Sequence, residues 1–286
     1  MKKGILLAVV IVLSTVGFAQ AQEGELSGDV DITYMSKFMY RGFAWYDSDS
    51  ATKTSADLDL YGTGLGLNVA WYLPMTSGHV NAERVDLTLS YSGSYLEGET
   101  YATDYTLGWM YYTFPDQPSG GNLDYVESTG DLSGLFSDLQ EIFVTLSWPE
   151  ICPAGIVPSY TVVRMWASES GSAISRGLSS IGAGGFGGWL HVLGLGYDLP
   201  VEDLLPDLPE QILHLSLSVT YNDGVMGVDN DWSHAVLGVS TDFDLGNNLT
   251  LTPAVYYQQA FEHTNLLSEH TFDDQLWCSL GLKYSF

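Results

Sequence analysis

The stretch LWCSLGLKYSF, residues 276–286, decides the fold class of this chain. Leu276, Cys278 and each second residue after them up to Phe286 form one apolar face, and mostly small or polar residues fill the positions between. A period of two is typical of a β-strand that buries one face. The same alternation returns at residues 65–73 and 213–221. Helical periodicity is nearly absent, so the sequence predicts an all-β protein.

Several segments of the chain carry this alternating pattern, and many are about ten residues long, which is the length of a transmembrane strand. A soluble sandwich also alternates. Aromatic ends on the apolar faces, as at Trp148, Tyr197 and Tyr284, are instead typical of the girdles of a membrane barrel. We therefore predict a closed antiparallel transmembrane β-barrel with twelve strands, near residues 27–42, 52–61, 64–74, 83–94, 101–114, 138–148, 156–167, 188–198, 211–222, 232–243, 248–260 and 275–286.

The first residues have the pattern of an export signal. Two lysines follow Met1, residues 4–18 are apolar, and Ala19-Gln20-Ala21 is a small-x-small cleavage site. We expect a signal peptide at residues 1–21 and a mature barrel at residues 22–286. Cleavage removes Lys2 and Lys3, which changes the formal net charge from -26 to -28.

The lengths of the connections predict an orientation in the bacterial outer membrane. With a periplasmic N-terminus, the two longest connections, residues 115–137 and 168–187, both fall on the outer side. Short periplasmic turns and long outer loops are the expected asymmetry of such barrels. The loop at residues 115–137 is long enough to fold inward as a constriction, although its sequence does not show this.

The charge of the chain excludes some partners and suggests others. Only 9 Lys and Arg stand against 35 Asp and Glu, so binding to nucleic acid is not expected. The expected partners are the lipid bilayer and lipopolysaccharide. Acidic outer loops would face this anionic surface, where divalent cations could bridge like charges.

The register of the strands assigns charges to the lumen. If the apolar face meets lipid, 5 basic and 9 acidic residues point inward, a surplus that favours cations weakly. Two interpretations stay open: a hydrated lumen that passes small hydrophilic solutes, or a structural or adhesive barrel whose interior is closed by salt bridges. The candidates for lining and selectivity are Lys37, Arg41, Asp57, Asp59, Arg84, Asp86, Glu141, Arg164, Asp242 and Lys283.

Two short motifs resemble a known family. Residues 36–42, Ser-Lys-Phe-Met-Tyr-Arg-Gly, resemble the Ser-x-Tyr-x-x-Arg-Gly motif of TorF-type porins, with Lys37 where an acid is common and Phe38 in place of Tyr. Residues 108–115 are similar to the family's Gly-x-x-Tyr-Tyr-x-x-Pro strand end. The resemblance implies an outer-membrane porin without catalytic residues. For Arg41 we expect either a lumen charge or an ion pair with Asp57 or Asp59 on the next strand.

Enzymatic and metal sites are weaker alternatives. His214 and Ser216 have the His-x-Ser spacing of outer-membrane phospholipases, but the register turns them into the lumen, away from lipid. His214 and His234 could form a pH-sensitive cluster. Two Glu-His pairs at residues 262–263 and 269–270 match no established ligand motif. We therefore expect a channel with no catalytic residues, no metal site and no cofactor.

Overall fold

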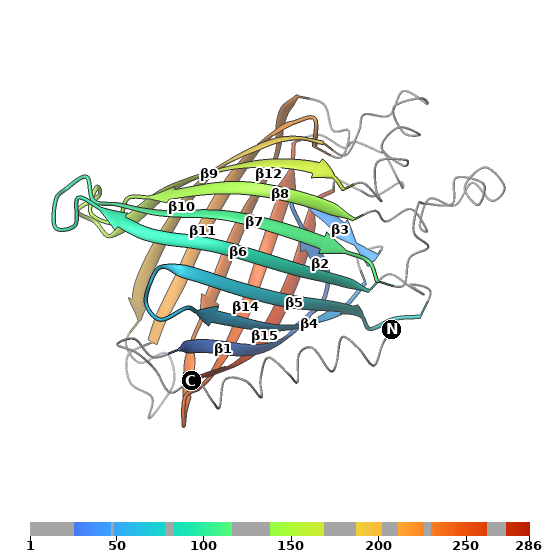
Figure 1. Ribbon diagram of the computed structural model, residues 1–286, viewed down its shortest axis with the longest axis horizontal. Coiled ribbons are helices and arrows are strands. Elements are labelled where there is room, and N and C mark those ends of the chain that lie inside the picture. Colours follow the sequence, from blue (N-terminus) through green and yellow to red (C-terminus); the bar gives the residue numbers. More distant parts are fainter. Residues whose placement is uncertain are drawn as a thin grey trace.

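The computed structural model describes residues 26–46, 49–77, 83–115, 138–168, 187–201, 211–225, 230–261 and 273–286. Twelve long antiparallel strands form one ring in this part of the chain, closed by the pairings of β1 with β15 and of β12 with β14 (Figure 1). The predicted twelve-stranded barrel is confirmed. Its strands are β1 (Ser27–Met35), β4 (Ala51–Asp59), β5 (Leu65–Pro74), β6 (Arg84–Tyr95), β7 (Thr103–Thr113), β8 (Leu139–Ser147), β9 (Ile156–Ala167), β10 (Gly188–Val201), β11 (Gln211–Asp223), β12 (Asp231–Thr241), β14 (Leu249–Ala260) and β15 (Gln275–Ser285). The short β13 (Phe243–Gly246) follows β12 and also pairs with β14.

The alternation of the sequence becomes the two faces of the barrel wall. On β15, Leu276 and Leu280 are 62% and 47% exposed on the exterior, whereas Trp277 and Ser279 line the lumen. Each of the twelve strands of the ring pairs with a neighbour on both of its edges, as lipid requires. No helix in the described part of the chain is long and apolar enough to cross a bilayer.

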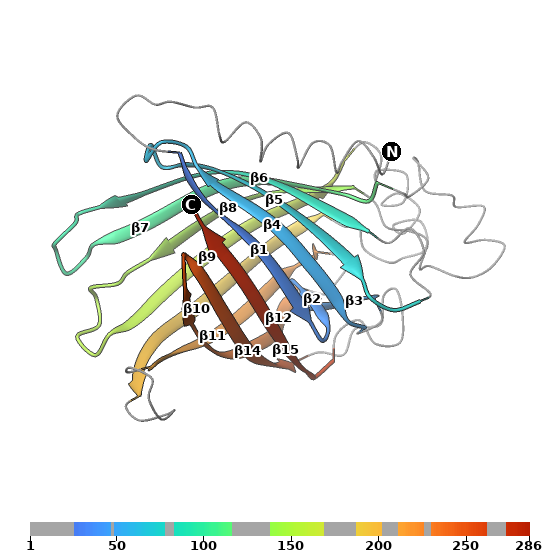
Figure 2. The ribbon, with the colours of Figure 1, turned by 90° about the horizontal axis from the view of Figure 1, so that it is seen from below.

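Both ends of the described chain lie at the end of the barrel that carries the short turns (Figure 2). Gly28 donates its amide to the Phe286 carbonyl at 3.0 Å, and Phe286 donates back at 2.9 Å. The strand ends that lead into the long connections lie at the opposite end of the barrel. Following the orientation predicted from the sequence, we call the end with the termini periplasmic and the opposite end outer. The predicted signal peptide at residues 1–21 lies outside the described residues, as does most of the loop at residues 115–137.

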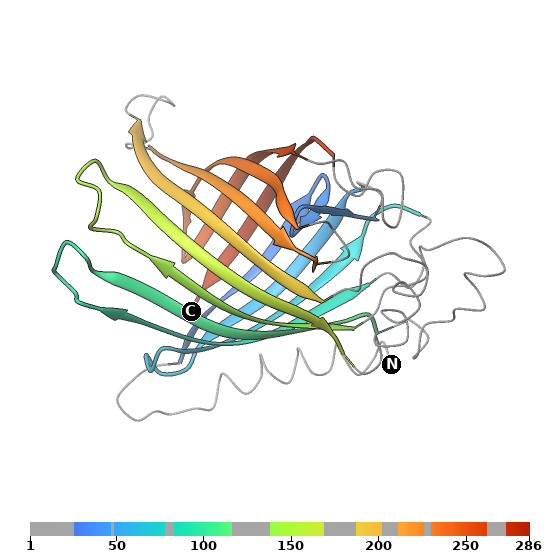
Figure 3. The same ribbon diagram turned by 90° about the horizontal axis from the view of Figure 1, so that it is seen from above.

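One element differs from the predicted strands. The segment expected to complete the first strand and its outer loop forms a hairpin of β2 (Phe38–Tyr40) and β3 (Phe43–Trp45), which lies inside the ring (Figure 3). Tyr40 pairs directly with Phe43, so the turn contains only Arg41 and Gly42, whose φ angles are 55° and 86°. Two consecutive residues with positive φ are typical of a two-residue hairpin turn, whose twist matches that of the two strands it joins. The chain therefore folds back into the barrel instead of continuing outward.

Aromatic packing holds this hairpin in place. Phe38 stacks on Tyr72 of β5 at 4.5 Å between ring centroids, and Trp45 stacks on Phe114 at 5.8 Å. The buried apolar cluster of the molecule thus lies in the outer half of the lumen, between hairpin and wall. It consists of Phe38, Phe43, Trp45, Tyr46, Ala51, Tyr112, Phe114, Leu139, Val163, Met165, Leu190 and Val225.

Candidate functional site

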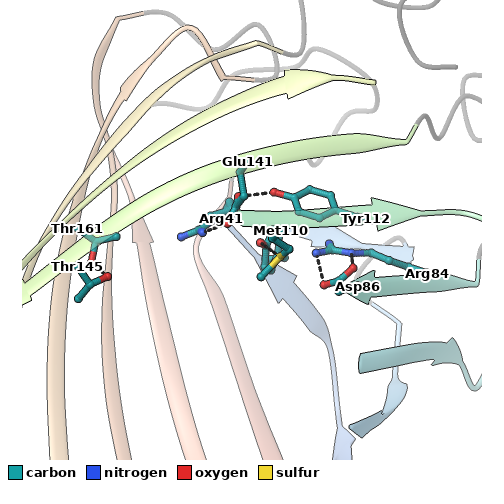
Figure 4. Close-up of polar contacts among 9 residues, drawn as sticks. Arg41, Arg84, Asp86, Met110, Tyr112, Glu141, Thr145 and Thr161 are labelled. Atoms are coloured by element: carbon teal, nitrogen blue, oxygen red, sulfur yellow. Dashed lines mark hydrogen bonds and ion pairs between the residues drawn. The ribbon is translucent and has the colours of Figure 1, made fainter. Parts of the chain in front are cut away.

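The tip of the β2–β3 hairpin reaches across the lumen. Arg41 Nη2 donates to Glu141 Oε1 on β8 at 2.5 Å (Figure 4). The neighbouring Gly42 carbonyl accepts a 2.9 Å hydrogen bond from Gln258 Nε2 on β14. β8 and β14 are five strands apart in the ring of twelve, so they lie on nearly opposite walls. The hairpin tip is therefore tied to both sides of the barrel.

Glu141 is the wall residue on which this tie depends. Its side chain is fully buried, and it also accepts a short hydrogen bond from the Tyr112 hydroxyl on β7 (Figure 4). The Arg41 guanidinium is 22% exposed because it borders open lumen on its other side. A charge-assisted pair with one fully buried partner holds its geometry better than an exposed pair.

A second ion pair anchors the base of the hairpin. Arg84 and Asp86 both point inward from β6, and Arg84 donates to the two oxygens of Asp86 at 2.7 Å each. The Arg84 guanidinium lies 4.0 Å from the ring centroid of Tyr40 and 4.4 Å from that of Tyr112. Three further rings, those of Phe38, Trp45 and Tyr72, lie 5.3–5.5 Å away. Cation–π contacts of this kind gain strength when they are desolvated, so Arg84 joins the hairpin to the wall.

Beside the hairpin, the lumen contains a cavity of ≈ 600 Å³. The hairpin packs on the β5–β9 side, and the cavity lies against β10–β15, β1 and β4. Arg41, Lys283 and the pair of Lys53 and Asp31, 3.1 Å apart, supply its Lys, Arg and carboxylate groups. Ser, Thr and Gln side chains and the His234 ring add further polar groups. This surface suits water and hydrophilic solutes.

The periplasmic mouth is acidic. A second cavity of ≈ 420 Å³ there is lined by Asp29, Asp57 and Asp59 together with serine and glycine residues. Asp57 accepts a 2.6 Å hydrogen bond from Asn68, and Asp59 accepts the Gly62 amide at 2.8 Å. The charged side chains that line this cavity are therefore all carboxylates.

His214 forms a small polar network in the periplasmic half of the lumen. Its Nδ1 lies 2.7 Å from Asp198, and its Nε2 lies 3.8 Å from Asp242, which also accepts a short hydrogen bond from Thr252. His214 pairs with Ser240 and His234 with Thr220, so the two histidines are six residues apart along the strands, about 20 Å. The pH-sensitive histidine cluster is therefore not formed.

The structure brings most of the predicted lumen residues together and corrects three assignments. Arg164 points outward, because its neighbours Val163 and Met165 are the ones buried against the hairpin. Arg41 pairs with Glu141, not with Asp57 or Asp59, since the hairpin carries it away from the next strand. Lys53, which we did not include, lines the cavity.

The remaining predicted residues stay inside the barrel. Lys37 donates to Gln275 on β15 at 2.6 Å, near the outer end of the lumen. Inside the described part of the chain, no cluster of three or more His, Cys, Asp or Glu side chains is placed to hold a metal ion. The Glu-His pairs at residues 262–263 and 269–270 lie outside the described residues, so no metal site can be assigned to that loop.

A sequence signal for the hairpin existed. Residues 38–45 alternate around Arg41-Gly42, and two short runs separated by two residues, one of them glycine, are typical of a hairpin. We assigned residues 38–42 to the end of the first strand and residues 43–45 to an outer loop, so the two halves of the hairpin were divided between two predicted elements.

A closed antiparallel barrel with an apolar exterior, aromatic ends and a polar lumen defines a transmembrane β-barrel of the bacterial outer membrane. No family model and no curated protein matches the chain.

Solved structures of outer-membrane porins and channels are similar in fold. The NanC porin aligns with a TM-score of 0.48 and 10% identity over 91% of this chain and 100% of that chain. The KdgM porin in complex with disordered oligogalacturonate aligns with a TM-score of 0.44 and 8% identity over 91% and 99%. An outer-membrane channel from Pseudomonas putida F1 aligns with a TM-score of 0.46 and 13% identity over 93% and 97%. Identities this low do not identify a solute.

Proposed function

We propose that the chain is an outer-membrane channel for passive diffusion of small hydrophilic solutes, and that the β2–β3 hairpin forms its constriction. The observation that carries this proposal is the polar cavity of ≈ 600 Å³ beside the hairpin. Charged and hydroxyl side chains on the wall keep such a space hydrated. The resemblance of residues 36–42 to TorF-type porins supports the same function, and membership of that family is part of the proposal.

We further propose a weak preference for cations. Nine acids lie on the lumen side against five bases, and the mouth residues Asp29, Asp57 and Asp59 face the solute first from the periplasm. Three of the bases, Arg41, Lys53 and Arg84, form ion pairs with lumen acids, which cancels three charges of each sign and leaves the surplus of four acids.

The test is reconstitution of the folded protein in a planar bilayer. We expect stepwise conductance and, under a salt gradient, a reversal potential on the cation-selective side. A matched Asp57→Asn, Asp59→Asn variant would move that potential toward zero. An anion-selective wild type would contradict the charge argument while leaving the channel intact.

One observation favours the alternative of a structural or adhesive barrel. The hairpin, its ion pair with Glu141 and the aromatic cluster packed against it occupy the outer half of the lumen on the β5–β9 side. If the protein migrates as a folded, heat-modifiable barrel and yet gives no conductance, the channel proposal is contradicted and this alternative is favoured.

Two further parts of the proposal concern export and the surface. We propose that residues 1–21 are removed as a signal peptide, and the sequence read from the N-terminus of the mature protein should begin at Gln22.

We also propose that the acidic outer loops engage divalent cations at the lipopolysaccharide surface. Chelation of Mg²⁺ and Ca²⁺ should then lower the thermal stability of the protein in outer membranes. An unchanged thermal stability after chelation would contradict the proposed cation binding.

A further inference from the structure

Arg164 lies on the lipid-facing side of the barrel. The residues on either side of it in β9, Val163 and Met165, are fully buried in the lumen, so the alternation of the strand turns Arg164 outward. Its cross-strand partners are Ile142 on β8 and Trp189 on β10, which are 48% and 41% exposed on the exterior. The Arg164 guanidinium lies 5.5 Å from the centroid of the Trp189 ring. A cation therefore rests on an aromatic surface outside the barrel.

This position is unusual within the molecule. Among the described residues, every other lysine or arginine lies on the lumen side, namely Lys37, Arg41, Lys53, Arg84 and Lys283. A cation on the lipid face costs about 2–4 kcal/mol at the bilayer midplane and about 0–1 kcal/mol near an interface. Arg164 is three residues from the outer end of β9 at Ala167, so it sits near the outer interface.

Aromatic side chains with polar tips lie on the exterior of β9, β10 and β11, the strands around Arg164. Further down the same pair of strands, the Tyr160 hydroxyl and His191 Nδ1 lie 2.7 Å apart on the exterior. The His191 ring also contacts Tyr221 on β11, with 6.3 Å between centroids. Aromatic residues with polar tips are enriched where hydrocarbon meets headgroups. The exterior of these strands thus carries amphipathic aromatic side chains two to four residues from the level of Arg164.

We propose that Arg164, held against the Trp189 ring, binds the phosphate of a phosphorylated glycolipid of the outer leaflet. The guanidinium matches phosphate in charge and can donate two parallel hydrogen bonds to it. The exposed Ile142 and Trp189 side chains offer apolar surface to the acyl chains of the same molecule. The site requires only the barrel in its membrane and does not depend on passage of a solute.

The test is native mass spectrometry of the folded protein in detergent with three probes: diphosphorylated lipid A, its dephosphorylated form and inorganic phosphate. We expect the wild type to retain diphosphorylated lipid A. Arg164→Gln should weaken that binding roughly tenfold or more, as loss of a charge-assisted hydrogen bond to phosphate implies. Arg164→Lys keeps the charge without the planar fork and should fall between the two.

The matched control is Lys283→Gln, which removes the same charge from the lumen and should leave lipid binding unchanged. Equal retention of diphosphorylated lipid A by the wild type and Arg164→Gln would overturn the proposal. Equal binding of the dephosphorylated form would overturn the role of phosphate. Inorganic phosphate that binds at Arg164 as tightly as lipid A would overturn the assignment to a lipid.

Discussion

Arg41 at the tip of the inner hairpin and Glu141 on β8 form an ion pair of 2.5 Å inside the barrel. The two residues are one hundred positions apart in sequence, and the pair joins an element of the lumen to the wall. Because Gly42 is tied to β14 on the other side, the tip is held across the passage. In the proposed channel, this relationship makes the hairpin the element that sets the open cross-section of the lumen.

Arg41→Ala should raise the single-channel conductance and increase its fluctuations, because it removes a side chain that lines the cavity and releases the tip from Glu141. Loss of a positive charge from the lumen should also move the reversal potential further to the cation-selective side. Lys283→Ala is the control, since it removes a lumen cation that is not on the hairpin. It should shift the reversal potential without added fluctuations, and equal fluctuations in both variants would contradict the role of the ion pair.

Gly42→Val should loosen the hairpin without unfolding the barrel. Gly42 has a φ of 86°, and a β-branched residue in this region is strained by about 1–2 kcal/mol. We expect noisier conductance with unchanged heat-modifiable migration. Gly246→Val places the same strain, at a φ of 78°, in a periplasmic turn and should leave the conductance unchanged. If the conductance of the Gly42→Val variant fluctuates no more than that of the wild type, this turn geometry is not needed to hold the hairpin.

Arg84→Met should destabilise the protein, because it leaves Asp86 buried without its partner. Removal of one member of a buried pair costs about 3–5 kcal/mol. The measurement is urea unfolding in detergent micelles. The double variant Arg84→Met, Asp86→Leu should recover part of the loss, since no charge is left buried. A double variant less stable than the single one would show that the aromatic contacts of Arg84, and not its charge pairing, dominate.

The register of β15 can be checked with cysteine labelling in liposomes. Cys278 is exposed on the lipid-facing side, whereas Ser279 lines the cavity. In a Cys152→Ser background, a charged, water-soluble thiol reagent should leave Cys278 unmodified. The Ser279→Cys variant, with Cys278→Ala, should react because its thiol faces water. Reversed labelling would mean that the strand is turned by one residue.

The sequence predicted the wall well because the wall follows a strict physical rule. Lipid on one side and a polar lumen on the other impose a period of two, so residues 276–286 and 213–221 determine their faces without knowledge of their neighbours. The β9 strand shows where this fails. Val163 and Met165 are apolar on the lumen side because the hairpin packs on them, which inverts the expected polarity and led us to turn Arg164 inward.

The hairpin itself could not be placed from local pattern alone. Its partners Glu141, Arg84 and Gln258 come from three distant strands, and only the closed ring brings them around the tip. The sequence predicted most of the lumen charges, because the register assigns a face to each residue of a strand. It did not predict the ion pairs that these charges form, because these depend on which strands face one another across the barrel.

The central claim, that the β2–β3 hairpin constricts the channel, is tested most directly by the single-channel conductance of a variant in which a short Gly-Ser linker replaces residues 38–45. The twelve wall strands remain in this variant, so heat-modifiable migration should still report a folded barrel. We predict a conductance several-fold above that of the wild type, with reduced discrimination between small and large solutes. A folded variant with the conductance of the wild type would contradict the account.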